Sequence, residues 1–356
     1  MNNLLEERYT RHIQHKLFIA LLLTGILVFL CLFGISIGGA SYNIPESWNA
    51  LISGLGKPIQ EMELSHQILW RLRVPRVLMA VVSGIGLALA GLVMQVILRN
   101  PLASPYTLGI SASASFGAAL AIILKTGITD IAPFTIPYDY LISANAFCFT
   151  FLSTFTIYGL SKSQKVTPET IVLFGVAVSY IFSAGLSFLQ YIGKSEELAA
   201  LAYWTFGSLS KANWTKLELC SGAVFIAALL IYRKAWDFNA LMLGDESAAG
   251  MGINVERLRL TGLVSASFIT AVIVSMLGPI GFIGLVAPHL GRILVGGDHR
   301  YLIPISCLLG MVLLVLADTL ARTLLSPVVL PVGIVTSVIG VPLLMYLIIK
   351  RKKEHW

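Results

Sequence analysis

Charged side chains are scarce in this sequence. Asp, Glu, Lys and Arg make up 12% of its 356 residues, whereas a soluble domain contains roughly 25%. Hydrophobic residues make up 56% of the chain, and the mean hydropathy is +0.83. This composition excludes an ordinary soluble globular protein and indicates a polytopic membrane protein.

Cysteine and metal-ligand patterns are also sparse. The four cysteines each lie in a different apolar run without C-x-x-C spacing, so neither a disulfide framework nor a thiolate metal site is indicated. His289 and His299 have no further ligand at metal-binding spacing, and the chain has no G-x-x-x-x-G-K-[ST] loop for ATP. Carboxylates are scarce in the apolar runs, where Asp318 is the main candidate, so a proton relay is not indicated.

Long apolar runs are abundant. Runs near the ~20 residues that cross a bilayer predict ten transmembrane helices. The predicted spans are 17–37, 77–98, 102–124, 140–161, 168–193, 213–232, 258–278, 281–297, 301–321 and 330–349. The first span has no small-residue cleavage site, so we interpret it as a retained helix. We therefore predict an all-α integral membrane protein, with a single transmembrane domain over residues 1–356.

Basic residues indicate the orientation of these helices. With the N-terminus inside, sixteen of the 25 Lys and Arg lie on the cytoplasmic side and nine on the outer side, as the positive-inside rule favours. Merging 281–297 with the preceding span gives eleven inside and fourteen outside, so ten spans fit better. Segment 1–16 and the basic tail 350–356 are thus predicted to be cytoplasmic. Topology explains the net charge of +7, and no nucleic-acid partner is predicted.

Two groups of arginines stand on the predicted outer side. Arg71, Arg73 and Arg76 form a dense cluster, which either anchors the helix at the interface or contacts an acidic external partner. Arg322 follows Asp318 by four residues, so the two side chains share one helical face. They either form an intrahelical pair or leave the guanidinium facing outward to the same partner.

The longest predicted cytoplasmic connection covers residues 233–257. Apolar residues alternate there with helix-compatible polar residues and with glycines, a pattern that predicts two short helices. A merely solvated loop would not need the apolar residues Leu241, Met242, Leu243, Met251 and Ile253. We therefore predict that this loop docks against a cytoplasmic partner.

Several motifs together resemble the FecCD-type permease family, the membrane subunits of ATP-driven importers for iron-siderophores, haem and cobalamin. They are 71–76 (RLRVPR), 91–95 (GLVMQ), 100–105 (NPLASP), 108–110 (LGI), 281–292 (GFIGLVAPHLGR), 298–300 (DHR), 316–318 (LAD) with 321–322 (AR), and 331–336 (PVGIVT). The resemblance implies the type II ABC importer permease fold in a bacterial or archaeal cytoplasmic membrane. It also implies a second permease copy or paralogue, two cytoplasmic ATPase subunits and an extracytoplasmic solute-binding protein as partners.

The resemblance further implies roles for individual residues. Arg73, Arg76 and Arg322 match positions that meet acidic residues of the binding protein. The segment that couples to the ATPase contains Leu243, Gly244, Glu246, Ala248, Ala249, Gly250 and Gly252. The cytoplasmic gate contains Asn100, Leu102, Thr167 and Pro168. Pro168 departs from the small polar pair that is typical of this family.

The function implied is that of a permease subunit that imports an iron chelate, with a ferric siderophore favoured over haem or cobalamin. The chain itself is expected to bind no cofactor and to be no enzyme, since ATP and Mg belong to the partner ATPase. A stand-alone secondary transporter and an integral membrane enzyme are the alternatives. The first would need paired intramembrane ions and the second a cluster of catalytic polar groups at one depth, and the sequence shows neither pattern.

Overall fold

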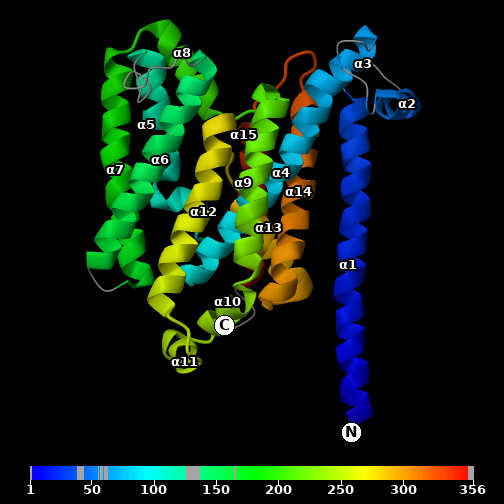
Figure 1. The fold of residues 1–356 in the computed structure, drawn as a ribbon, viewed down its shortest axis with the longest axis vertical. Helices are drawn as coiled ribbons and strands as arrows, with labels where there is room; N and C mark the ends of the chain where they lie inside the picture. Colours follow the sequence, from blue (N-terminus) through cyan, green and yellow to red (C-terminus); the bar gives the residue numbers. More distant parts are fainter. Residues whose placement is uncertain are drawn as a thin grey trace.

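The computed structural model describes residues 2–37, 44–54, 56, 59, 63–125, 137–163 and 166–351. Within these residues every regular element is helical, as the sequence predicted. Figure 1 shows long helices running side by side, with the N-terminal end of α1 (Asn2–Ser36) and the short helices α10 (Ala235–Met242) and α11 (Asp245–Gly250) at one end. Helices α2 (Ile44–Gly54) and α8 (Ser195–Thr205) lie at the other. We call these the α11 end and the α8 end.

Seven helices among the described residues are long and apolar enough to cross a membrane. They comprise α1, α4 (Val74–Ile97) with the residues before it, α6 (Tyr138–Ser163), α7 (Pro168–Ile192), α9 (Trp214–Tyr232), α12 (Val255–Leu277) and α14 (His299–Thr323). Three shorter apolar segments lie in α5 (Ile110–Ile123), α13 (Ile283–Val295) and α15 (Val332–Arg351). Each predicted span overlaps one of these ten helices.

The ends of the predicted segments differ in detail from the helices. Span 102–124 is broken, because Pro105–Leu108 forms a 3-10 turn (η3) and Gly109 adopts φ 79° before α5 begins. A positive φ of this kind is readily available only to glycine. The predicted cytoplasmic segment 1–16 is helical from Asn2 and continuous with the first span. Of the predicted tail 350–356, residues 352–356 lie outside the described part of the chain.

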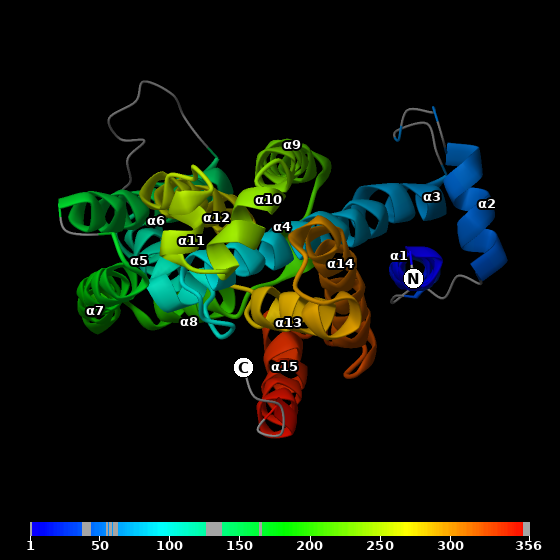
Figure 2. The ribbon, with the colours of Figure 1, turned by 90° about the horizontal axis from the view of Figure 1, so that it is seen from below.

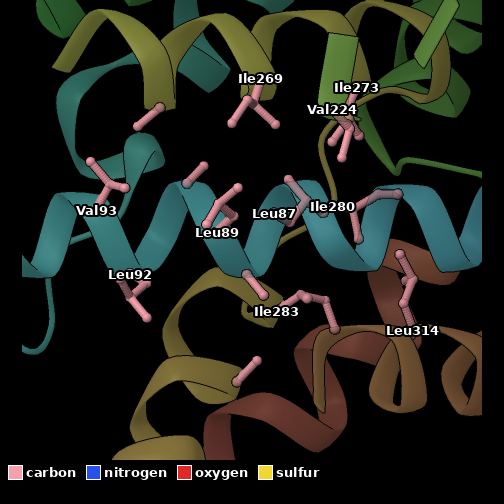
Figure 3. Packing of buried hydrophobic residues seen from close by; sticks show 14 of the residues in the cluster. Leu87, Leu89, Leu92, Val93, Val224, Ile269, Ile273, Ile280, Ile283 and Leu314 are labelled. Atoms are coloured by element: carbon pink, nitrogen blue, oxygen red, sulfur yellow. The ribbon is translucent and has the colours of Figure 1, made fainter. Parts of the chain in front are cut away.

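Helix α4 is the centre of the bundle and is more deeply buried than any other long helix. In Figure 3, Leu87, Leu89 and Val93 of α4 lie toward Ile269 and Ile273 of α12. On the opposite side α4 packs against α13 and α14. Viewed from below in Figure 2, α6, α9 and α12 lie on one side of α4, and α13 and α15 on the other. The core therefore surrounds a single central helix.

Glycines let the helices around α4 approach it closely. A Cβ added at Gly84 would collide with the backbone of Gly310 in α14, and one added at Gly91 with the backbone of Gly284 in α13. Such close approach drives helix association in lipid, where expulsion of apolar groups from water contributes nothing. Small residues within 83–91 of the sequence therefore pack α4 directly against two neighbouring backbones.

A π-helical turn, η2 (Leu69–Arg73), joins α3 (Leu64–Ile68) to α4. The amide of Val74 donates to the carbonyl of Leu69, five residues earlier, which inserts one residue into the helical repeat. Trp70 lies in this turn and donates its indole N–H to the carbonyl of Ala50 in α2 at 3.3 Å. Its ring stacks on Trp214 of α9 with 6.2 Å between centroids. The turn therefore connects the central helix with two peripheral ones.

Candidate functional site

The predicted connection 233–257 forms the two short helices that its pattern indicated, α10 and α11. They meet at Gly244, whose φ of 125° is strained for any other residue. Asp245 and Glu246 occupy the first turn of α11, where carboxylates are favoured by the positive end of the helix dipole. Gly252, with φ 83°, follows α11. Glycines at both ends of α11 therefore fix its direction.

The tip of this loop exposes apolar side chains. Leu243 is 68% exposed, Met251 60% and Met242 43%. Clustered exposed apolar residues mark surfaces that a partner covers. Ala249 shares this exposed surface, whereas Ala248 is fully buried. A bulky residue at Ala248 would therefore disturb the packing of the loop itself, and Ala249 is the position that reports on the exposed surface.

Asp245 joins the loop to the transmembrane helices. Its carboxylate accepts two hydrogen bonds from Arg259 of α12, at 2.7 and 2.8 Å, and pairs with Arg99 after α4 at 2.6 Å. Arg259 also donates to the carbonyl of Ile97 at 3.1 Å, and more weakly to that of Val166 at 3.5 Å. One aspartate thus links α11 with α12, with the end of α4 and with the segment before α7. We call Asp245, Arg259 and Arg99 the inner cluster.

The electrostatics of the inner cluster keep Asp245 ionised. Burial alone would raise the pKa of this carboxyl, but hydrogen bonds from Arg259 and the charges of Arg259 and Arg99 outweigh it and lower the pKa below 3.8. The Arg259 side chain is only 2% exposed, so it depends on Asp245 for charge compensation. Arg99 also donates to the carbonyl of Leu241 at 3.0 Å, which fixes the end of α10 as well.

The predicted gate residues begin two segments beside the inner cluster. Asn100 accepts a hydrogen bond from the amide of Leu102 at 2.9 Å, forming a local turn after α4. Thr167 is the N-cap of α7, and Pro168 follows it in the first turn, where a missing amide donor is tolerated. Because Arg259 binds backbone carbonyls just before both segments, the structure places them together around one buried side chain.

A second polar group fixes α10 to the start of α14. Asn239 accepts a hydrogen bond from the amide of His299 at 2.8 Å and donates to Asp298 at 2.9 Å. Arg300 binds Asp298 at 2.6 Å and lies over the ring of Trp236, 4.3 Å from its centroid. The hydrogen bond from Arg300 holds the pKa of Asp298 well below its ordinary value. The 298–300 motif therefore anchors the loop at its other end.

The three arginines predicted to dock the binding protein lie in the interior at the α8 end. Arg76 binds both oxygens of Asp318 at 2.8 to 3.1 Å, and Arg322 lies 3.1 Å from the same carboxylate. The exposed fraction is 13% for the Arg76 side chain, 7% for Arg322 and 1% for Asp318. The intrahelical pair predicted from the four-residue spacing is confirmed. Arg71 is exposed.

Two of these arginines also hold the end of α1. Arg73 donates to the carbonyls of Ile35 at 3.0 Å and Ser36 at 2.9 Å, and Arg322 donates to that of Ile37 at 2.8 Å. Carbonyls at a helix C-terminus have no helical amide to bind, so the guanidinium groups satisfy them. We call Arg73, Arg76, Arg322 and Asp318 the outer cluster. It fastens α1 to α4 and α14.

The members of the inner cluster are absent from the functional residues inferred from sequence. The orientation count placed both Arg257 and Arg259 on the cytoplasmic side, with Arg259 at the start of the predicted span 258–278. Positions two apart on a helix point about 200° apart, so one of the two had to face the bundle. The structure exposes Arg257 and buries Arg259. That spacing is the signal that identifies Arg259, whereas Asp245 has no comparable signal in its local sequence.

Residues 26–350 match the model of the FecCD transport family. The chain belongs to the FecCD transport family. It is 42% identical to an ABC transporter permease protein of Methanocaldococcus jannaschii, over 98% of this chain and 99% of that protein. It is 35% identical to the hemin transport system permease protein HmuU of Yersinia pestis, over 96% of this chain and 98% of that protein. It is 36% identical to the cobalamin import system permease protein BtuC of Halobacterium salinarum, over 86% and 80%.

A solved structure agrees with this assignment. An inward-facing metal-chelate type ABC transporter superposes on this FecCD protein with a TM-score of 0.79 and 30% identity, covering 94% of this chain and 99% of the other. The resemblance inferred from the motifs is thus confirmed, and the chain is a membrane-embedded permease subunit of the ABC importer type. Its loop at the α11 end and its arginines at the α8 end are the candidate contacts with other subunits.

Proposed function

We propose that this FecCD permease imports an iron chelate across a bacterial or archaeal cytoplasmic membrane. In this proposal ten helices span the membrane with both termini in the cytoplasm, and the permease pairs with a second copy or a paralogue. Two ATPase subunits bind the α11 end, and a solute-binding protein docks at the α8 end. The inner cluster is the observation that supports the proposal best, because it connects an exposed apolar loop to the ends of membrane helices.

The α10–α11 loop supplies the ATPase contact in this proposal. Leu243, Met242 and Met251 give it an apolar surface, and Glu246, Ala249, Gly250 and Gly252 are exposed beside them. Helices of eight and six residues are too short to be stable alone, so they transmit movement only if they are fixed to the bundle. Asp245 provides that attachment at one end of the loop and Asn239 at the other.

Movement of the loop would then reach the inner gate through Arg259. A displacement of α11 carries the Asp245 carboxylate, and with it the guanidinium that binds the backbone before the two gate segments. Asn100 and Leu102 begin one segment, and Thr167 and Pro168 begin the other. The gate therefore opens and closes with the position of α11. This movement requires no chemically reacting group in the permease.

The outer cluster contributes to docking through its charge. Arg73, Arg76 and Arg322 together with Asp318 leave a surplus of two positive charges near the α8 end. Because these side chains are fixed to Asp318 and to α1, they attract acidic residues of a binding protein mainly through their field. Exposed Arg71 adds a charge that can contact the partner directly. Docking is thus expected to be sensitive to salt.

A ferric siderophore is the cargo that we propose, within a chelate class that includes haem and cobalamin. Related permeases are named for hemin and for cobalamin, so family membership alone leaves the chelate open. In this proposal the binding protein selects the chelate and the permease conducts it. Identifying the chelate that co-purifies with the cognate binding protein tests the cargo separately from the transport mechanism.

Reconstitution into liposomes tests the transport mechanism. With the ATPase and the binding protein present, we expect ATP-dependent accumulation of the chelate. An Ala249→Arg variant should keep ATP hydrolysis but lose most of the accumulation, since the added charge and bulk stand on the exposed loop surface. Accumulation by the permease alone, without any ATP-hydrolysing subunit, would contradict the proposal and favour a stand-alone secondary transporter.

A further inference from the structure

A groove of about 680 Å³ runs between α6 and α12 at the α11 end. Phe155 and Tyr158 of α6 and Leu260 of α12 contribute apolar walls, and Lys162 and Arg257 stand at the ends of these helices. Helices α6 and α12 are neighbours in both Figure 1 and Figure 2 and pack against each other. The groove thus has an apolar part and a cationic part.

Aromatic contacts close the groove toward the middle of the bundle. Phe268 of α12 packs edge-on against Phe147 and Phe151 of α6, with centroids 6.2 and 5.9 Å apart. The two helices run antiparallel, so Phe155 and Lys162 lie beyond these contacts, alongside Leu260 and Arg257. The groove is therefore a slot that opens toward the cationic end.

The two cations of the groove are not neutralised within the described part of the chain. Lys162 and Arg257 are exposed and have no ion pair there. Glu256 is the carboxylate that lines the groove, which leaves one net positive charge. A neighbouring groove of about 610 Å³ shares Arg257, but Lys234 there is already paired with Asp237 at 2.9 Å. The α6–α12 groove therefore presents two cations without an ion pair among the described residues, whereas its neighbour presents only Arg257, which the two grooves share.

Hydroxyl groups along the groove need no ligand of their own. Thr261 donates to the carbonyl of Arg257 at 2.8 Å, and Ser265 donates to that of Thr261 at 2.7 Å. Both side chains thereby satisfy their donors within α12 and are tolerated on a surface that faces lipid. The charges of Lys162 and Arg257 remain available to an anionic occupant.

The shape and charge of the groove define one class of occupant. A cationic opening at the ends of membrane helices, continued by an apolar slot along them, matches the phosphate and acyl chain of a lipid. Figure 2 places α6 and α12 on the side of α4 away from α13 and α15. We propose that the α6–α12 groove binds an anionic phospholipid, with its phosphate on Lys162 and Arg257 and an acyl chain along Phe155 and Leu260.

The bound lipid would contact α12, the helix that also carries Arg259 of the inner cluster. Arg257 and Arg259 lie on opposite faces of the first turns of α12, so lipid contacts one face and Asp245 the other. This inference needs the chain only to be embedded in a membrane. It does not depend on the proposed cargo, orientation or ATPase coupling.

Native mass spectrometry of the full-length chain tests this site. Protein would be exchanged into detergent with equal amounts of phosphatidylglycerol and phosphatidylcholine, and the lipid retained per chain would be counted. We expect selective retention of phosphatidylglycerol. Replacing Lys162→Gln and Arg257→Gln together should lower it roughly 25-fold, since each basic residue near a lipid headgroup contributes about fivefold in affinity. Glu256→Gln should raise retention, because it removes the one repulsive carboxylate of the groove.

Arg233→Gln is the matched control, since Arg233 is an exposed cation that lines neither groove. Its retention of phosphatidylglycerol should equal that of the unaltered chain. Added inorganic phosphate should not displace the lipid, because a free ion gains nothing from the apolar slot. Equal retention of both lipids, an equal loss in Arg233→Gln, displacement by phosphate, or reduced retention in Glu256→Gln would each overturn the proposal.

Discussion

The inner and outer clusters have similar compositions but differ in burial and in what they hold. Each contains one aspartate that binds two arginines. Asp318 in the outer cluster is 1% exposed, whereas the side chain of Asp245 in the inner cluster is 42% exposed. A charge pair sealed from water is costly to break, while one that water can reach breaks and re-forms more readily. The comparison indicates an anchor at the α8 end and a movable joint at the α11 end.

Removing the carboxylate of the outer cluster should produce the largest effect. Asp318→Ala leaves the buried guanidinium groups of Arg76 and Arg322 without their counter-charge, which typically destabilises a protein by about 3–5 kcal/mol. Thermal unfolding of the purified permease in detergent measures this loss. Asp237→Ala, which breaks the exposed pair with Lys234, should leave the unfolding temperature nearly unchanged. Equal stability of Asp318→Ala and the unaltered chain would show that the outer cluster is no anchor.

Asp245→Asn should affect transport more than folding. The variant keeps the shape of the side chain but loses charge-assisted hydrogen bonds to Arg259, each worth about 1.5–3 kcal/mol. We expect uptake per ATP hydrolysed to fall about tenfold, the factor that corresponds to about 1.4 kcal/mol. Transport assays in proteoliposomes measure this ratio, with Asp237→Asn as the control on the same loop. An unchanged ratio would remove Asp245 from the coupling pathway.

A double substitution sharpens the distinction between joint and anchor. Replacing Asp245→Asn and Arg259→Met together removes the buried charge along with its partner. Because an apolar side chain of similar size tolerates burial, the unfolding temperature should return toward that of the unaltered chain while transport stays low. Recovery of transport in the double variant would mean that coupling does not require the ionic link between Asp245 and Arg259.

Docking at the outer surface should respond moderately to Arg71→Glu. Arg71 is exposed, and exposed ion pairs contribute about 0.2–1 kcal/mol. The affinity for the binding protein should therefore fall about twofold to fivefold at low salt, and the difference should fade as salt is raised. Affinity measurements at two salt concentrations test this, with Lys194→Glu, an exposed change before α8, as the comparison. Equal effects of the two substitutions would mean that docking has no preference for the arginine-rich side.

The smallest expected effect is the response of the inner cluster to pH. The pKa of Asp245 is lowered from 3.8 in the folded protein, so its contribution is fully present above that value and is lost as pH falls through the lowered pKa. Hydrogen exchange of α11 amides, after correction for intrinsic rates, should therefore be constant from neutral pH down to about 4. Below that it should rise in the unaltered chain but not in Asp245→Asn. A change near neutral pH would indicate another titrating group.

Much of the fold was predictable because hydrophobic runs directly mark helices that cross a membrane. The Asp318–Arg322 pair was also predictable, since both residues lie one helical turn apart on the same helix. The Arg76–Asp318 contact was not, because 242 residues separate its members and only the packing of α4 on α14 brings them together. The break at Gly109 had no distinct signal either, since 31 glycines are present and few adopt a positive φ.

The candidate sites show the same division between local and long-range information. The glycine-bounded helix pair in 233–257 follows from composition alone. The burial of the three outer arginines does not, because counting charges on each side treats every arginine as though it faced water. Their docking and the roles of the gate residues stay predictions.

The π turn η2 allows one continuous helix to serve two sets of neighbours in different rotational phases. Trp70 within it points to α2 and α9, while Arg73 and Arg76 point to α1 and Asp318. An α-helix rotates about 100° per residue, so deleting a single residue here would swing Trp70 away by about that angle with the arginines held in place. Deleting one residue from η2 would therefore remove the whole interface that Trp70 makes with α2 and α9.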